Sequence, residues 1–138
     1  MEKALIDSGP LTALFDKNDN YHTAVVRFMK TYSGTLYSLL TEVTHLLDFS
    51  VHAQIDFLTW IYKGGVEVVN FHTKDLGRVI ELIGKYSNVP MDLADASLLF
   101  ISEVDEVRDI VTIDSDYYIY RTKKKRMLNN LLDPYLKQ

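Results

Sequence analysis

The chain has 138 residues, 47% of them hydrophobic, and a formal net charge of −4, which fit one compact domain over residues 1–138 with an ordinary core. No run approaches the roughly 20 apolar residues of a membrane span, and the start of the chain turns acidic too soon for a secretory signal, so we expect a soluble cytoplasmic protein without membrane contact. The absence of cysteine excludes thiolate zinc sites, disulfides and cysteine nucleophiles, so a metal would bind oxygen or imidazole ligands.

Strand and helix signals alternate along the chain. Short apolar runs bounded by turn residues indicate strands, and apolar residues at helical spacing follow them. The expected strands are residues 3–7, 35–40, 64–71 and 109–113, and the expected helices begin near residue 11 and cover 20–32, 41–49, 51–62, 73–86 and 91–104. This order predicts an α/β fold with a central parallel sheet covered by helices on both faces.

Charge is unevenly distributed along the chain. Residues 1–120 hold 9 Lys and Arg against 18 Asp and Glu, whereas residues 121–138 hold 6 against 1. The basic run "RTKKKR" lies at the start of this C-terminal segment. Such a run is typical either of a solvated tail or of a surface that contacts phosphate.

Acidic residues occur where the predicted strands end. In an open parallel sheet, ligands bind in the crevice outside the carboxyl ends of the strands, so acids at these positions should converge. The acids concerned are Asp7, Glu42, Asp92, Asp95, Asp114 and Asp116. Converging carboxylates repel one another, and a chain keeps them chiefly where a cation offsets that repulsion. Mg²⁺ or Mn²⁺ is the natural cation, since both prefer carboxylate oxygens and both promote displacement at phosphorus.

Four sequence blocks resemble, in order and context, the acidic blocks of PIN-domain proteins, most closely the small bacterial VapC-like type. These blocks are "LIDSGPLTALFD", "LLTEVTHLLD", "PMDLADASLLF" and "IVTIDSDYYIYR". The resemblance implies a three-layer α/β/α PIN-like fold and a Mg²⁺- or Mn²⁺-dependent endoribonuclease. It further implies the toxin of a type II toxin-antitoxin pair, with an RNA substrate, a cognate antitoxin and a homodimeric state.

Carried over residue by residue, the resemblance assigns the four catalytic and metal-binding acids to Asp7, Glu42, Asp95 and Asp114. Asp116 corresponds to an acid often present before the family's aromatic residue, so it would be an additional ligand or would position water.

Three further residues lie close to these acids in the sequence. Thr112 would orient a ligand or a phosphate, and Ser8 would either hydrogen-bond near the metal or cap the first helix. Asp92 stands three residues before Asp95 at a helix start, a spacing that favours N-capping over metal binding. Asp7 alone is also compatible with a helix cap.

The aromatic run after Asp116 alternates as a strand would, so two of Tyr117, Tyr118 and Tyr120 should share one face. The default expectation for these tyrosines is packing in the core or at the sheet edge, and the alternative is that an exposed one stacks on a base. The basic residues that follow would then contact the RNA backbone, namely Arg121, Lys123, Lys124, Lys125 and Arg126.

Two other functional classes remain open. A phospho-acceptor domain would use Asp7 or a neighbouring residue as its acceptor, but Ser115 and Asp116 stand where its lysine is expected. A catalytically silent PIN-like module would bind RNA or protein without cleaving. Neither Gly-rich phosphate loop, GxGxxG or GxxxxGK[ST], is present in the sequence.

Overall fold

The structure is a computed structural model that describes residues 2–39, 43–89 and 91–137. Within these residues, five parallel strands form one sheet in the order β3-β2-β1-β4-β5. The strands are β1 Lys3–Ile6, β2 Thr35–Ser38, β3 Glu67–Val68, β4 Asp109–Val111 and β5 Asn129–Asn130. The predicted parallel sheet is therefore confirmed.

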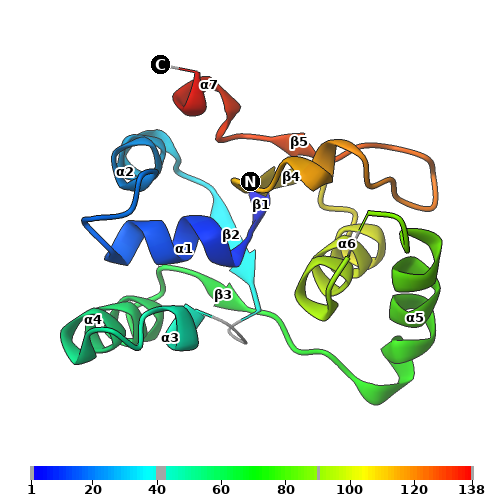
Figure 1. Cartoon of the computed structure of the whole chain (residues 1–138), viewed down its shortest axis with the longest axis horizontal. Helices are drawn as coiled ribbons and strands as arrows, with labels where there is room; N and C mark the ends of the chain where they lie inside the picture. Colours follow the sequence, from blue (N-terminus) through cyan, green and yellow to red (C-terminus); the bar gives the residue numbers. More distant parts are fainter. Residues whose placement is uncertain (1, 40–42, 90, 138) are drawn as a thin grey trace.

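Helices cover both faces of this sheet, with α1, α2, α4 and α7 on one side and α5 and α6 on the other (Figure 1). The α-helices are α1 Ser8–Phe15, α2 His22–Thr31, α3 Val43–Leu46, α4 Val51–Tyr62, α5 Leu76–Lys85, α6 Leu93–Asp105 and α7 Asp133–Leu136. Two short 3₁₀ helices, η1 Thr73–Asp75 and η2 Ser115–Tyr118, complete the described elements. None of the described helices is both long and apolar enough to cross a membrane.

Two hydrophobic cores separate the three layers. Along β1, Ala4 and Ile6 enter the core beneath α1, α2 and α4, whereas Leu5 enters the core beneath α5 and α6. Successive side chains of a strand point to opposite faces, so a buried central strand must be apolar on both. This burial confirms the predicted three-layer α/β/α arrangement.

Strand β4 ends two residues earlier than the sequence predicts. The amide of Asp114 donates to Thr112 Oγ1 at 3.0 Å, and the amide of Asp116 donates to Asp114 Oδ1 at 2.9 Å. These side chains accept hydrogen bonds from the backbone amides that a longer strand would pair with its neighbour. The strand therefore ends, and η2 begins.

The strand-like alternation expected for the tyrosines is accordingly wrong. Tyr117 and Tyr120, three residues apart around the η2 turn, are buried, and Tyr118 is exposed. Alternation would instead have paired Tyr118 with Tyr120. Side chains three apart share a face in a 3₁₀ helix, which accounts for the observed pairing.

The strand predicted at residues 64–71 is reduced to the two residues of β3. Gly64 adopts a positive φ of 93° just after α4 ends, and Gly65 lies against the Trp60 ring with no room for a side chain. Both glycines therefore belong to the turn that closes α4 rather than to the strand.

Of the helix predicted at residues 41–49, residues 41 and 42 lie outside the described residues, and α3 covers Val43–Leu46. The predicted C-terminal end is wrong, because residues 47–49 form a turn. The helix at 51–62 matches α4 at both ends. Its N-cap, Ser50, accepts a hydrogen bond from the Ala53 amide at 3.2 Å.

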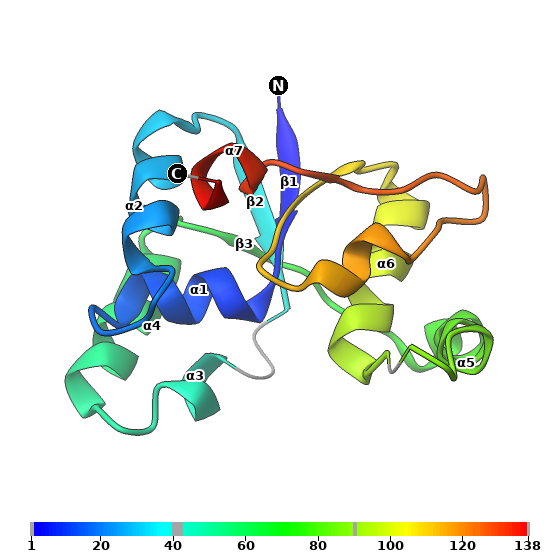
Figure 2. The same cartoon turned by 45° about the horizontal axis from the view of Figure 1, so that its top comes forward.

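The chain order creates a switch point between β1 and β4. From β1 the chain builds β2 and then β3 outward on one side, and it later returns to add β4 on the other side of β1. Connections from these two strands diverge, which leaves a crevice at their carboxyl ends. In Figure 2 the end of β1 meets the start of α1 there, beside the η2 segment and α6.

Candidate active site

Three predicted acids converge at this crevice. Asp7 directly follows β1, Asp95 lies in the first turn of α6, and Asp114 is the N-cap of η2 after β4. One carboxylate oxygen from each lies within 4.8 Å of the other two. The fold thus brings together acids that are separated by 88 and 19 positions in the sequence.

Asp7 is buried and held at both carboxylate oxygens. Its Oδ1 accepts from the Ser8 amide at 2.9 Å, and its Oδ2 accepts from Thr112 Oγ1 at 2.9 Å. Asp7 is the N-cap of α1, so the alternative that Ser8 caps this helix is wrong. The capping bond and the Thr112 bond together fix the orientation of the carboxylate.

Thr112 connects two of the acids. Its hydroxyl donates to Asp7 and accepts from the Asp114 amide, so one side chain sets the position of both. The backbone of Thr112 is held in turn by the Asn130 side chain, which accepts from its amide at 3.2 Å and donates to its carbonyl at 2.9 Å. Sequence reasoning missed Asn130, since an asparagine after a basic run gives no strand or site signal.

Asp92 and Asp95 form a reciprocal cap at the start of α6. Asp92 Oδ1 accepts from the Asp95 amide at 2.8 Å, and Asp95 Oδ2 accepts from the Asp92 amide at 3.4 Å. Asp92 is therefore the N-cap that its spacing favoured. The other oxygen of Asp95 accepts from the buried Tyr117 hydroxyl at 3.4 Å, a contact that the strand interpretation of Tyr117 could not predict.

Burial and the repulsion between neighbouring carboxylates disfavour the charged forms of Asp7 and Asp95. Desolvation raises the pKa of Asp7 to about 6, against the lowering effect of the Ser8 and Thr112 hydrogen bonds. Desolvation and the charge of Asp92 raise the pKa of Asp95 to about 7. A bound cation would offset both effects, because an adjacent positive charge favours ionised carboxylates.

The remaining predicted acids have other positions. Asp116 is not among the three carboxylates that the described chain brings together, and its amide donates to the side chain of Asp114, the N-cap of η2. Glu42 lies outside the described residues.

The basic run lies away from the acids, beside the C-terminal end of α6 (Figure 2). Arg121 donates to the carbonyls of Tyr118 and Tyr120, at 2.6 and 3.0 Å, so its guanidinium supports the local backbone. Residues 122–126 form a tight turn in which Thr122 and Arg126 are joined by a 2.9 Å backbone hydrogen bond. Lys123 to Arg126 are exposed.

The three acids line an open pocket of about 480 Å³. Tyr21, Leu46 and Ile113 contribute to its walls, beside the acids and the first turn of α1. Thr12 also lines it, and its hydroxyl is buried without a hydrogen-bond partner in the part of the chain that the structure describes. The carboxylate oxygens, the raised pKa values of Asp7 and Asp95 and the open space beside them fit a hard divalent cation.

The described strands and helices form a PIN-like α/β/α fold, with Asp7, Asp95 and Asp114 at the carboxyl edge of its five-stranded parallel sheet. A search of solved structures finds the crystal structure of Mycobacterium tuberculosis VapC20, a sarcin-ricin loop cleaving toxin, with a TM-score of 0.76. The match covers 84% of this chain and 93% of VapC20 at 13% sequence identity. The predicted resemblance to VapC-like proteins is thereby confirmed at the level of the fold. The sequence matches no protein-family model and no curated protein.

Proposed function

We propose that this protein is an endoribonuclease that requires Mg²⁺ or Mn²⁺ and is the toxin of a type II toxin-antitoxin pair. The observation that carries the proposal is the convergence of Asp7, Asp95 and Asp114 at the switch point of a PIN-like sheet. Three buried or half-buried carboxylates so close together are costly unless a cation is bound.

Asp7, Asp95 and Asp114 would hold the cation, with Glu42 as the fourth acid and Asp116 as an additional ligand. A bound Mg²⁺ or Mn²⁺ supplies Lewis-acid stabilisation of the charge that develops on the phosphodiester during hydrolysis. Thr112 keeps two of the carboxylates in fixed positions, so little reorganisation is needed when substrate arrives.

The proposal includes partners that the family resemblance implies. The substrate is cytoplasmic RNA, and an antitoxin would cover the acidic crevice. The protein would act as a homodimer. VapC20 cleaves a sarcin-ricin loop, so an RNA containing this loop is a suitable first substrate.

The test is cleavage of that RNA, and of a pool of structured RNAs, by purified protein with Mg²⁺, Mn²⁺ or EDTA. We expect cleavage with either metal, none with EDTA, and at least a 100-fold loss in Asp7→Asn and Asp95→Asn variants of unchanged circular dichroism. The control is Asp56→Asn, which removes the same charge from an exposed position on α4.

Cleavage that persists in EDTA or in the folded Asp95→Asn variant would contradict the proposal. No cleavage of any RNA by the wild-type protein, together with no metal binding, would favour the silent binding module.

A further inference from the structure

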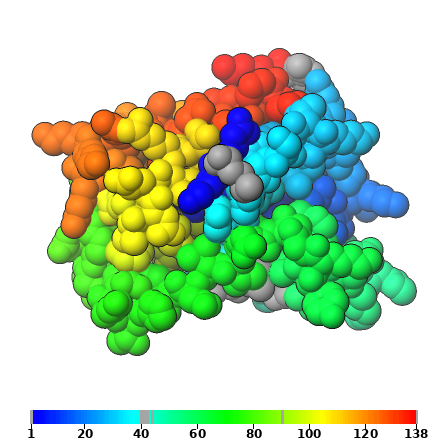
Figure 3. All heavy atoms as spheres, turned by 180° about the vertical axis from the view of Figure 1, so that it is seen from behind, coloured from blue at the N-terminus to red at the C-terminus, as the bar shows by residue number. Residues whose placement is uncertain are grey.

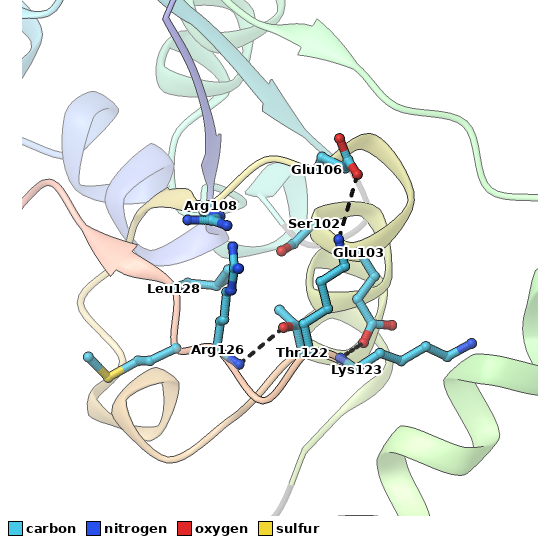
Figure 4. A pocket seen from close by; sticks show the side chains of 10 residues that line it. Ser102, Glu103, Glu106, Arg108, Thr122, Lys123, Arg126 and Leu128 are labelled. Atoms are coloured by element: carbon cyan, nitrogen blue, oxygen red, sulfur yellow. Dashed lines mark hydrogen bonds and ion pairs between the residues drawn. The ribbon is translucent and has the colours of Figure 1, made fainter.

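A second pocket, of about 450 Å³, lies at the C-terminal end of α6 (Figure 4). None of the proposed catalytic residues is among the residues that line it. Its walls come from the last turn of α6, from Arg108 before β4, and from the turn at residues 122–126. The end of α6 and the segment around residues 120–127 lie side by side on the face shown in Figure 3.

Positive charge predominates around this pocket. Four cationic residues line it against two carboxylates, Glu103 and Glu106. Glu103 is already compensated, because Arg78 binds it through two nitrogens at 2.9 and 2.8 Å and the Lys123 amide also donates to it. Glu106 lies 3.9 Å from Lys124 Nζ, and both side chains are exposed. The pocket therefore retains an excess of positive charge although the chain as a whole is acidic.

Arg108 and Arg126 provide the uncompensated charge. Neither guanidinium has a hydrogen-bond or ion-pair partner among the described residues, and in Figure 4 the Arg126 side chain extends toward Arg108. Lys123 points away from them in the same view. Two unpaired guanidinium groups beside each other repel unless an anion lies between them.

Ser102 adds a hydroxyl to the same wall. The residue is only 4% exposed, yet its Oγ lines the pocket and has no hydrogen-bond partner within the described chain. A hydroxyl and two guanidinium forks present many donors in a small space. Guanidinium groups bind phosphate through paired hydrogen bonds, so the chemistry of this wall matches a phosphate group.

Helix α6 relates this pocket to the acidic site. Ser102 follows Asp95 by seven residues, so both lie on the same face of α6, roughly 10 Å apart along its axis. Stacked nucleotides advance about 3.4 Å each along one strand, so about three nucleotides cover that distance. Exposed Tyr118 and Ile119 lie at the C-terminal end of η2, in the stretch of chain between Asp114 and the turn at residues 122–126.

We propose that the pocket of Ser102, Arg108 and Arg126 binds a backbone phosphate of the RNA substrate a few nucleotides from the bond that is cleaved. This inference rests on the proposed function and adds a substrate-binding site to it. Residues 1–120 are acidic, and their negative charge repels RNA, so a cationic site is needed to hold the RNA backbone.

The test is equilibrium binding of a fluorescein-labelled RNA of about 15 nucleotides to the full chain in EDTA, by fluorescence anisotropy at several salt concentrations. For the Arg108→Gln/Arg126→Gln double variant we expect a Kd at least tenfold higher at low salt. The slope of the logarithm of the binding constant against the logarithm of the salt concentration should be smaller in magnitude by about 1 to 2. The control double variant, Lys30→Gln/Lys63→Gln, removes the same charge from exposed positions on α2 and after α4 and should bind nearly as the wild type does. Ser102→Ala should produce a smaller loss.

Equal affinity of the Arg108/Arg126 variant and the control would overturn the inference, as would wild-type protein that binds no RNA. Unlabelled polyglutamate is titrated as a competitor in the same assay. If the Arg108→Gln/Arg126→Gln variant loses polyglutamate binding but keeps its RNA affinity, the inference is overturned and the pocket is assigned to an acidic protein. RNA cleavage by the wild type is measured separately. If the wild type cleaves no RNA but the Arg108→Gln/Arg126→Gln variant binds RNA more weakly than the wild type, the proposed function is rejected and the pocket is supported as an RNA-binding site.

Discussion

At the level of single residues, Asp7 has a structural role as a helix cap and also belongs to the acid cluster. It caps α1 through the Ser8 amide and at the same time lies among the three acids. Its sequence context alone favoured either role, and the two do not exclude each other, because a carboxylate has two oxygens and several lone pairs. The Thr112 hydrogen bond could not be predicted in detail, since it joins residues 105 positions apart.

The high pKa of Asp7 makes the metal-free protein sensitive to pH. Asp7 titrates near pH 6 when folded and near 3.8 when unfolded, so the folded state binds more protons between these values. The free energy of unfolding should therefore fall as pH rises from about 4 to 6, by up to about 3 kcal/mol from this group. Thermal melts in EDTA across this range check the direction.

The Asp7→Asn variant should remove that dependence. Asparagine keeps an acceptor for the Ser8 amide but carries no charge to bury, so its Tm in EDTA at pH 8 should exceed that of the wild type. An equal dependence of Tm on pH between 4 and 6 in the variant and the wild type would contradict this role of Asp7.

Thr112→Val should impair activity without removing a metal ligand. Valine has the same shape but leaves the Asp114 amide and an oxygen of Asp7 without their partner. We expect RNA cleavage to fall by about 10- to 100-fold, with weaker metal binding. Thr112→Ser, which keeps the hydroxyl, should restore most of both, and equal activity of the valine variant and wild type would contradict this role.

At the level of elements, the longer helices were predictable, whereas the edge strand β3 was predicted too long and the edge strand β5 was not predicted. Helix α4 has a strong cap at Ser50 and a long apolar pattern, so local signals define both its ends. Strands β3 and β5 have two residues each and exist only because a neighbouring strand pairs with them. Asparagine has a low strand propensity, so Asn129–Asn130 gave no signal.

Asp92 provides a test of capping against metal binding on α6. Asp92→Ala should lower the free energy of unfolding by about 1 kcal/mol, because the N-cap is lost, whereas Asp92→Asn should have little effect on stability. If Asp92 only caps α6, the Asn variant should also keep most of its cleavage activity. A loss as large as that of Asp95→Asn would instead make Asp92 a ligand.

At the level of the whole molecule, the order of strands and helices was sufficient to predict where three of the expected acids, Asp7, Asp95 and Asp114, meet. Parallel strands place their carboxyl ends at one edge, and this rule applies even when strand lengths are wrong. The position of the basic run was not predictable in this way. Its turn follows η2 toward the far end of α6, and this path depends on tertiary contacts such as the hydrogen bond from the Arg121 amide to Tyr86 Oη.

The proposed homodimer has a candidate surface on α4. Val51, Ile55, Leu58 and Tyr62 are exposed at helical spacing and form one apolar stripe, which a second copy would cover about a two-fold axis. Ile55→Arg should therefore convert the dimer into a monomer in light scattering, whereas His52→Arg, on another face of the helix, should not. A wild-type monomer at high protein concentration would contradict this arrangement.

The central claim is that Asp7, Asp95 and Asp114 together bind a divalent cation, and calorimetric titration of the EDTA-treated, dialysed protein with Mn²⁺ tests it most directly. We predict saturable binding by the wild type and by Asp56→Asn, and at least a tenfold weaker affinity in folded Asp114→Asn. No binding by the wild type, or equal affinity in Asp114→Asn, would contradict the claim.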